Sequence, residues 1–248
     1  MAGLIAGLAA LGLWELLSRA GTLNPLYFPP PTVVGITLVA RATGGDLAPH
    51  AAATLARLSL AFGAAALVGV PLGLAMGMIR PLRLVLDPYI AALYPLPKIA
   101  LLPLLMILLG VGEQAFVLAG SLTALFQIIL NTYGGVTQID PVLLEVGHNY
   151  GARGLALFRR ILLPAALPSI LTGLRLGLGL ALITTIAVEF TAAKSGLGHL
   201  VFRAWQTLAA AEMFAALAVV GVIGLAITRG LLCLQRRLLA WQQTYEWD

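Results

Sequence analysis

Charged residues are scarce in this chain of 248 residues, where Asp, Glu, Lys and Arg together make up only 10%. Soluble domains usually carry about 25% charge, and the mean hydropathy here is +0.97. The apolar residues come in long blocks, and a helix needs about 20 of them to cross a bilayer. We therefore expect a protein that spans a membrane several times and has no room for a separate soluble catalytic domain.

Cysteine, lysine and histidine are almost absent, and each shortage excludes a kind of site. The single cysteine, Cys233, cannot form a disulfide within the chain. Neither of the two lysines follows the glycine-rich lead of an ATPase phosphate loop. The three histidines are far apart and form no His-Glu-x-x-His zinc site, and the chain has no Gly-x-Ser-x-Gly elbow. We expect no enzymatic activity, no metal site and no cofactor bound by this chain.

Basic residues outnumber acidic ones by five, but they are scattered and form no stripe that would indicate nucleic acid. They indicate orientation instead. If both termini are cytoplasmic, the inner segments 80–87, 140–160 and 229–248 hold eight Lys and Arg, and the outer segments 18–57, 112–113 and 191–211 hold five. The excess on the inside favours this orientation.

Six hydrophobic segments are interpreted as membrane spans, at 2–17, 58–79, 88–109, 114–135, 165–190 and 212–232. They are continuously apolar and lack the alternation of a barrel wall. The sequence therefore predicts an all-α bundle of about six transmembrane helices, forming one domain over 1–248. The first fourteen residues contain no Lys or Arg, so the first segment is expected to be a retained span and not a cleaved signal peptide.

Glycine and proline positions add detail to these spans. Small residues four apart let helices approach closely, and this spacing occurs at Gly69, Gly73 and Gly77 and again at Gly173 and Gly177. Proline lacks the N–H that helices need. The third span contains Pro95, Pro97 and Pro103, which predict a kink beside a transport route.

The segment 140–164 is longer than a simple connection needs to be, because links between helices usually take two to eight residues. Asp140 followed by Pro141 is a plausible helix start, Gly151 interrupts the pattern, and three arginines precede Pro164. We expect a short helix, a glycine break and a second helix at the membrane surface. The residues alone also fit an amphipathic helix held to lipid headgroups by its arginines.

This segment resembles the EAA loop of ABC importer permeases, whose pattern is Glu-Ala-Ala, three residues, Gly, nine residues, Ile-x-Leu-Pro. The chain keeps both spacings, with Val146 and Gly147 in place of the alanines, which should make the first helix slightly looser. Segments 26–34, 93–113, 163–182 and 195–200 are similar to the branch of that family that imports sulfonates, taurine and nitrate.

The resemblance implies a type I ABC importer permease in a prokaryotic inner membrane. Two permease copies would assemble with two cytoplasmic ATPase subunits, which hold ATP and Mg, and receive cargo from an extracytoplasmic binding protein. The loop would sit in a cleft of the ATPase, with Glu145 for polar contact and helix capping, Gly151 for the turn, and Leu163 with Pro164 for entry into the fifth span. Arg153, Arg159 and Arg160 would contact the ATPase or anionic lipid. The implied coupling residues are Glu145, Gly151, Ala152, Arg153, Ile161, Leu163 and Pro164.

Polar side chains inside spans are costly in lipid, so they are candidates for the translocation pathway. Lys98, next to the prolines of the third span, would suit an anionic cargo. Alternatively, Lys98 pairs with Glu189 or with a helix C-terminus and never meets cargo. The full candidate set is Tyr94, Lys98, Gln127, Asn131, Arg175, Thr184 and Glu189.

Other functions fit parts of the same sequence. A stand-alone carrier driven by an ion gradient would use buried carboxylates such as Glu15, Glu189 or Glu212 and would show symmetry between its halves, which is not apparent. A structural or assembly protein leaves segment 140–164 unexplained. Within ABC importers, a neutral or heterocyclic nutrient such as a vitamin precursor is the alternative cargo.

Overall fold

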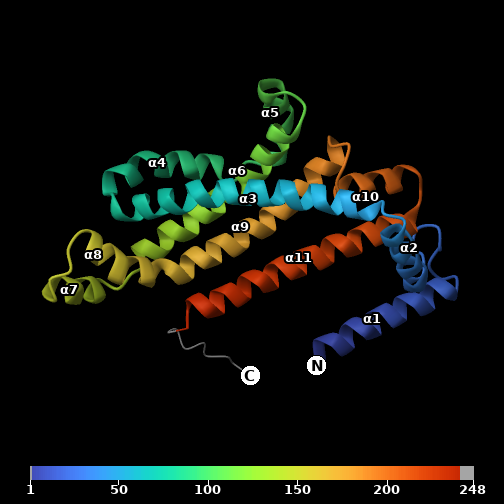
Figure 1. The fold of residues 1–248 in the computed structure, drawn as a ribbon, viewed down its shortest axis with the longest axis horizontal. Helices are drawn as coiled ribbons and strands as arrows, with labels where there is room; N and C mark the ends of the chain where they lie inside the picture. Colours follow the sequence, from blue (N-terminus) through green and yellow to red (C-terminus); the bar gives the residue numbers. More distant parts are fainter. Residues whose placement is uncertain (1, 241–248) are drawn as a thin grey trace. The chain divides into compact units, whose positions relative to one another are not determined.

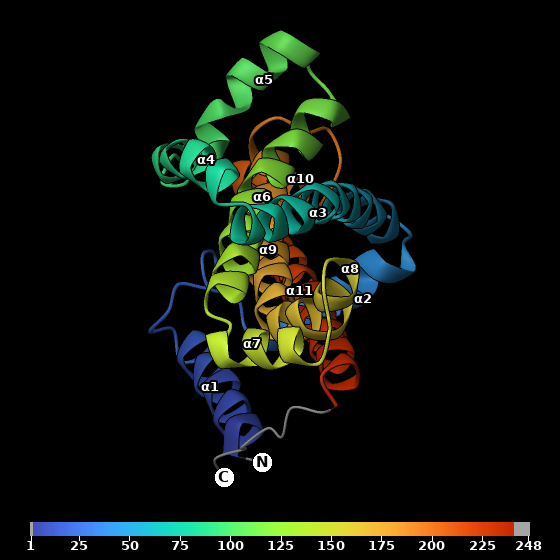
Figure 2. The ribbon, with the colours of Figure 1, turned by 90° about the vertical axis from the view of Figure 1, so that its left-hand side faces the viewer.

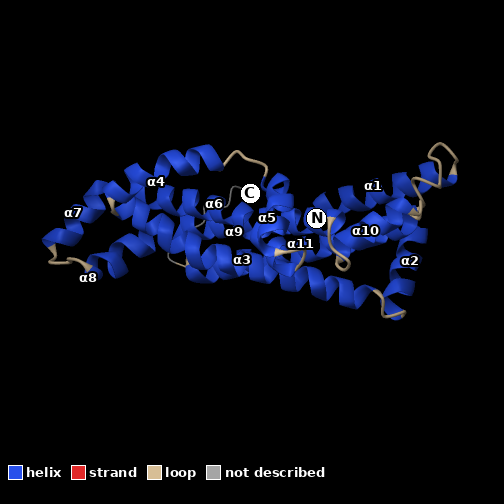
Figure 3. Ribbon diagram, turned by 90° about the horizontal axis from the view of Figure 1, so that it is seen from above, coloured by secondary structure: helices blue, strands red, loops and turns tan. Residues whose placement is uncertain are grey.

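The computed structural model describes residues 2–240, and every described element is a helix (Figures 1 and 3). The prediction of an all-α fold is confirmed. The elements are α1 (Ala2–Arg19), α2 (Pro31–Thr43), α3 (Leu47–Met78), α4 (Arg80–Leu93), η1 (Lys98–Leu101), α5 (Leu102–Leu109), α6 (Glu113–Thr137), α7 (Pro141–Asn149), α8 (Leu155–Leu157), η2 (Phe158–Leu162), α9 (Leu163–Thr191), α10 (Leu197–Gln206) and α11 (Ala210–Leu238).

Four of the described helices are long and apolar enough to cross a membrane: α3, α6, α11 and the continuous helix Leu155–Thr191, which contains α8, η2 and α9. They coincide with the expected spans 58–79, 114–135, 165–190 and 212–232. The expected span 2–17 falls on α1, and its crossing of the membrane stays a prediction.

The expected span 88–109 is not one helix. Its first part belongs to α4, and Lys98–Leu109 continues at an angle of 88° to Arg80–Leu93. Pro95 and Pro97 in the break cannot donate backbone hydrogen bonds and disfavour helix in the residue before them. The segment 80–87 was expected to be a loop but is helical. Pro81 does not prevent this, because it lies in the first turn of α4, where proline is tolerated.

Two helices, α2 and α10, occupy segments that were expected to be outer connections. With 13 and 10 residues they are too short to be found as spans. In addition, α3 begins at Leu47, well before the expected start of its span at residue 58. The span was expected to start after Arg57 because this residue is charged. In the structure Arg57 lies inside α3 and is only 4% exposed.

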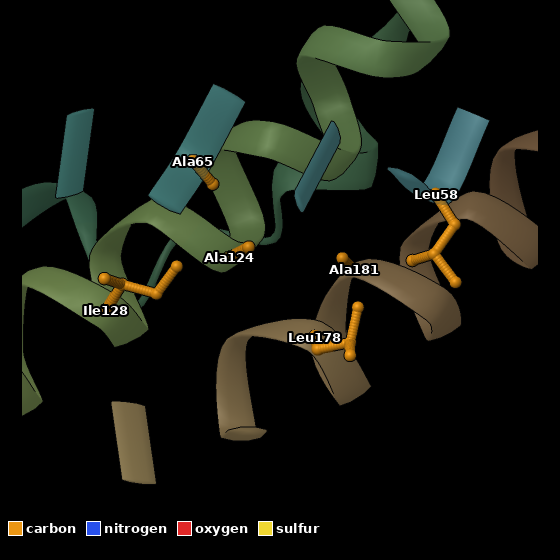
Figure 4. Packing of buried hydrophobic residues seen from close by; sticks show 6 residues of the cluster. All are labelled: Leu58, Ala65, Ala124, Ile128, Leu178 and Ala181. Atoms are coloured by element: carbon orange, nitrogen blue, oxygen red, sulfur yellow. The ribbon is translucent and has the colours of Figure 1, made fainter. Parts of the chain in front are cut away.

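The described residues form two compact units, 2–57 with 185–224 and 58–184 with 225–240, and α3, α9 and α11 contribute to both. The core of the second unit is built by α3, α6 and α9 (Figure 4). Its buried residues, each less than a tenth exposed, are Leu58, Ala65, Ala124, Ile128, Leu178 and Ala181.

Glycines let α6 pack closely against both α3 and α9, as their spacing predicted. A Cβ added at Gly73 would lie 2.7 Å from the Cβ of Thr132, and one at Gly77 would lie 2.5 Å from the Cβ of Val136. On α9, a Cβ added at Gly173 would lie 2.7 Å from the Cβ of Asn131. Only residues without a side chain fit at these crossings.

In the first unit, aromatic side chains join the N-terminal helix to the start of α11. The ring of Phe214 lies 5.1 Å from that of Trp14 and 6.5 Å from that of Phe28, measured between centroids. The hydroxyl of Ser18 donates a hydrogen bond of 2.7 Å to the carbonyl of Phe28. These contacts hold the connection between α1 and α2 against α11.

Candidate functional site

The segment 140–164 forms the expected helix, glycine break and second helix. Figure 2 looks onto it, with α7 and α8 in yellow between the ends of α6 and α9. The Asp140 side chain caps α7 by accepting a hydrogen bond of 2.9 Å from the N–H of Val142. Glu145, for which the resemblance implied polar contact and capping, lies inside α7 and is exposed, so the side chain that caps the start of this helix is that of Asp140.

Gly151 makes the turn after α7. Its φ of +79° lies in the left-handed region that favours glycine. Two short hydrogen bonds close the turn: Gly151 N–H donates to the carbonyl of His148, and Ala152 N–H donates to the carbonyl of Gly147, both at 2.9 Å. Gly154, with φ +53°, makes a second left-handed step before α8. The chain therefore reverses sharply between the two helices of the loop.

Gly147 is the point of closest approach between these two helices. A Cβ added at Gly147 would lie 2.2 Å from Cδ1 of Ile161 and 3.0 Å from Cδ1 of Leu157. The glycine was expected to loosen the first helix. In the structure it is buried and lets α7 pack directly against the second helix, so the motif residue Ile161 is held in place by it.

The second helix of the loop continues into α9, so that Leu155–Thr191 is one helix and no break separates the loop from the fifth span. Residues Phe158–Leu162 form a π-helical turn next to Pro164, which cannot donate the usual backbone hydrogen bond. Leu163 and Pro164 are half-buried at the entry into α9, where the motif was expected to place them.

The outer surface of the loop is apolar and basic. Five of its large apolar side chains are exposed: Val142 (61%), Leu143 (44%), Val146 (45%), Tyr150 (89%) and Leu155 (68%). We call these five apolar residues the loop face. Arg153, Arg159 and Arg160 are also exposed, and Ala152 is half-buried. Side chains of this kind cluster on protein surfaces that receive a partner.

Three pathway candidates come together in the second unit. The Tyr94 hydroxyl lies 3.4 Å from Oε1 of Gln127, at the limit for a hydrogen bond. The Lys98 ammonium donates to the carbonyls of Tyr94 and Leu93, the latter at 3.1 Å, where α4 ends. It also lies 4.8 Å from the ring centroid of Phe126. Lys98 therefore contacts the C-terminus of α4, one of the two partners expected for it.

Asn131 lies on α6 one turn after Gln127 and lines a polar groove between α6 and α9. Its side-chain amide donates to the carbonyl of Gln127 at 2.8 Å. The groove has a volume of about 370 Å³ and is lined by Leu130, Asn131, Gly134, Gly135, Gln138, Pro168, Ser169 and Thr172. Its lining carries amides and hydroxyls but no charged side chain. Arg175, half-buried, and Thr184, 8% exposed, lie on α9, outside this lining.

Glu189 belongs to the other unit and is fully buried. Its Oε1 accepts a hydrogen bond of 2.8 Å from Nη1 of Arg57, and its Oε2 accepts from the Thr54 hydroxyl at 2.8 Å and from the N–H of Gly198 at 3.0 Å. The expected alternative of a Lys98–Glu189 pair is wrong, because Arg57 is the partner of this carboxylate.

Sequence reasoning missed Arg57 because an arginine beside an apolar block was interpreted as the end of a span. One signal could have found it. His50, Thr54 and Arg57 are spaced by four and three residues, which places them on one face of a helix. The segment 195–200, noted only as a likeness to a family, meets this face with two backbone N–H groups, which donate to His50 and Thr54.

All three carboxylates that an ion-driven carrier would use are paired with arginine. Besides the Glu189–Arg57 pair at 2.8 Å, Glu15 lies 2.5 Å from Arg19, and Glu212 lies 2.5 Å from Arg41. Hydrogen bonding to Glu212, with a smaller contribution from Asp46, raises the pKa of Arg41 above its ordinary value, so this arginine keeps its charge. The structure thus gives no support to ion coupling through these groups.

Comparison with known proteins decides the family. The sequence pattern of the family described as "Binding-protein-dependent transport system inner membrane component" matches residues 69–240, more than half of the chain. The chain belongs to this family of ABC importer permeases. The permease is accordingly a multi-pass inner-membrane protein and not an enzyme, and it works with a separate ATPase and a substrate-binding protein.

Curated relatives align along most of the permease. It is 37% identical over 236 residues to the taurine transport system permease protein TauC of Escherichia coli, covering 93% of this chain and 86% of the relative. It is 33% identical to the putative aliphatic sulfonates permease SsuC of Escherichia coli, covering 95% and 89%. It is 31% identical to the nitrate import permease NrtB of Synechocystis, covering 77% and 70%.

A solved structure confirms the fold. The permease resembles a chain of the inward-facing MetNI methionine ABC transporter with a TM-score of 0.66, covering 75% of this chain and 92% of that one. At 21% identity this likeness concerns the fold alone. The expected type I importer architecture is therefore correct.

Proposed function

We propose that this permease moves a small organic sulfonate or a related oxyanion, delivered by its binding protein, into the cytoplasm. The observation that carries the proposal is the 37% identity, over 93% of the chain, to a taurine permease. The names of the other two relatives specify aliphatic sulfonates and nitrate, which also present a compact anionic head group to the transporter.

We propose further that the loop face docks on the ATPase. Its five exposed apolar residues supply the buried contact that such a docking needs, and the three exposed arginines supply a polar rim. Two permease copies would then carry two ATPase subunits, which bind ATP and Mg. Only 28% of the most apolar window of α3 and 11% of that of α11 is buried within the chain, which leaves apolar surface for the second copy and for lipid.

For the pathway, we propose Lys98 as the cation that meets the anionic cargo. An ammonium has three donors, and Lys98 directs two of them at the carbonyls of Leu93 and Tyr94. Tyr94 and Gln127 flank it, and the uncharged groove around Asn131 offers hydrogen bonds without a tight charge pair, which suits release. The remaining pathway proposals are Arg175 and Thr184.

The cargo proposal is tested by reconstituting the permease in proteoliposomes with its ATPase and its binding protein. We expect ATP-dependent uptake of labelled taurine or methanesulfonate, measured by filtration, and competition between these sulfonates. Nitrate uptake without sulfonate uptake would narrow the cargo to inorganic anions. If the purified binding protein instead carries a neutral or heterocyclic nutrient, the oxyanion proposal is wrong.

Lys98→Met tests the pathway proposal. Loss of the cation should lower the maximal transport rate, at saturating loaded binding protein, about tenfold, which corresponds to about 1.4 kcal/mol in the barrier. Lys194→Met is the matched control, because it removes the chain's other lysine from an exposed loop and should leave the rate unchanged. A normal rate in Lys98→Met would show that Lys98 serves only as a helix cap.

A further inference from the structure

A dense polar cluster ties the end of α9 to α3 and to the start of α10 in the first unit. Besides binding Glu189, Arg57 donates from Nη1 to the carbonyl of Ser195 at 2.6 Å and from Nη2 to the Ser195 hydroxyl at 2.9 Å. Thr54 donates to Glu189 and accepts from the N–H of Leu197 at 2.9 Å. Thr54 and Glu189 are 0% exposed and Arg57 is 4% exposed. We call these five residues and Gly198 the anchor cluster.

Two glycines of the segment 195–200 lie so close to the end of α9 that no side chain would fit at their positions. A Cβ at Gly196, where φ is +116°, would lie 2.2 Å from Cδ of Glu189, and a Cβ at Gly198 would lie 2.3 Å from the carbonyl of Ile186. The first N–H groups of α10 have no partner within the helix. Here the N–H of Gly198 donates to Glu189 and the N–H of Leu197 donates to Thr54. The start of α10 is therefore bound to the Glu189 side chain in the last turn of α9.

A buried ion pair is weak evidence for stability, because an apolar replacement of similar volume is often as stable. Breaking such a pair is different, since each charge would then stay buried without a partner. Opening the anchor cluster would separate Arg57 from Glu189 and also remove partners from two N–H groups of α10. These contacts therefore favour a joint that stays closed over one that opens at every turnover.

The other end of the same helix leads to the coupling loop, because Leu155–Thr191 is continuous. Between the loop and Glu189 this helix contains Pro168, which lacks an N–H, and Gly179, beside which a Cβ would meet open space. Proline removes one backbone hydrogen bond and is a usual cause of helix bending. The helix thus has one end held by polar contacts and a deformable stretch before it.

We propose that the anchor cluster is a fixed point of the transport cycle. It holds the end of α9 closed in both the resting and the ATP-trapped states, so that movement imposed at the coupling loop is taken up within α9. Arg57 and Glu189 are then positioning residues for transport. This inference rests on the coupling role proposed for the loop. It adds that the opposite end of α9 stays in place while the loop moves.

The first test measures whether the cluster opens. Thr54→Cys is placed in a Cys233→Ser background of the assembled transporter in proteoliposomes, and labelling by a membrane-impermeant maleimide is followed without nucleotide and with ATP plus vanadate. Lys194→Cys, in the exposed loop beside the cluster, is the accessible control, and Ala193→Cys, 8% exposed in the same loop, is a second buried probe that leaves the ion pair intact. We expect both buried probes to react about tenfold or more slower than the accessible control in both states, because protected groups react only through rare opening.

A rise in labelling of Ala193→Cys to the rate of the accessible control in the trapped state would overturn the proposal, even if Thr54→Cys failed to fold. Vanadate trapping requires the ATPase but not a particular cargo, so a wrong cargo assignment leaves this test intact.

The second test asks whether the anchor matters for coupling. Arg57→Met with Glu189→Met removes both charges and leaves neither one buried alone. We expect normal insertion and ATPase activity but about threefold more ATP hydrolysed per solute transported, a size typical of energetic coupling between sites. A purely structural role would change transport and ATPase activity together, so an unchanged ratio contradicts the inference.

Discussion

Replacing Gly151 with valine is expected to abolish ATP-driven transport while leaving the permease in the membrane. At φ +79° the glycine occupies a conformation that a β-branched residue adopts only with strain of about 1–3 kcal/mol. No neighbouring atom lies within 4 Å of an added Cβ, so the effect arises from the backbone and not from a clash. Relief of the strain would open the turn between Gly147 and Ala152 and displace Tyr150 from the loop face.

Transport by Gly151→Val should fall by more than about tenfold, because coupling needs the loop face in one geometry. Stimulation of ATPase activity by loaded binding protein should fall with it. Gly230→Val is the control, since Gly230 is exposed in α11, has an ordinary helical φ and has open space around it. Intact transport and ATPase stimulation in Gly151→Val would refute the coupling assignment of this loop.

Arg57→Met is expected to destabilise the permease by about 3–5 kcal/mol, because it leaves the fully buried carboxylate of Glu189 without its cation. Thr54 and Gly198 would still donate to Glu189, but neither carries a charge. The effect is measured as a loss of the protein recovered from the membrane and as a lower unfolding temperature in detergent.

The combined change Arg57→Met with Glu189→Met should recover most of that loss, since no lone charge then stays buried. Arg19→Met is the matched single variant: it breaks the ion pair with Glu15, but the Arg19 side chain is 63% exposed. Exposed pairs contribute little to stability because solvent screens their charges. Equal losses in Arg57→Met and Arg19→Met would mean that burial of the Arg57 pair does not matter.

Local patterns predicted much of the second unit. The spacing of Gly69, Gly73 and Gly77 predicted close helix contact because small residues four apart share one helix face, and α6 packs there. The coupling motif predicted the turn at Gly151 because its φ depends on the residue itself. Asp140 and Pro141 predicted the start of α7, and Asp140 caps this helix because the capping residue is adjacent in sequence to the helix that it serves.

Predictions failed where a residue's surroundings come from distant parts of the chain. Arg57 was taken as the limit of a span, but a charge can lie inside an apolar helix when a partner 132 residues away neutralises it. The third span shows the opposite case: Pro95 and Pro97 predicted its kink from the sequence alone, because proline interrupts the backbone ladder locally, and the structure confirms a bend of 88°.

The scarcity of charge by itself determined that this chain lives in a membrane, and the motif at 145–164 determined its family, since both are properties of residue type and short-range order. Which ionised groups contact each other and which contact a helix end was decided only by the tertiary structure. Lys98 ends on the last carbonyls of α4, and Glu189 is enclosed by Arg57, Thr54 and the N–H of Gly198. The physical reason is that the cost of a buried charge depends on the atoms folded around it, and these come from α3, α9 and α10 together.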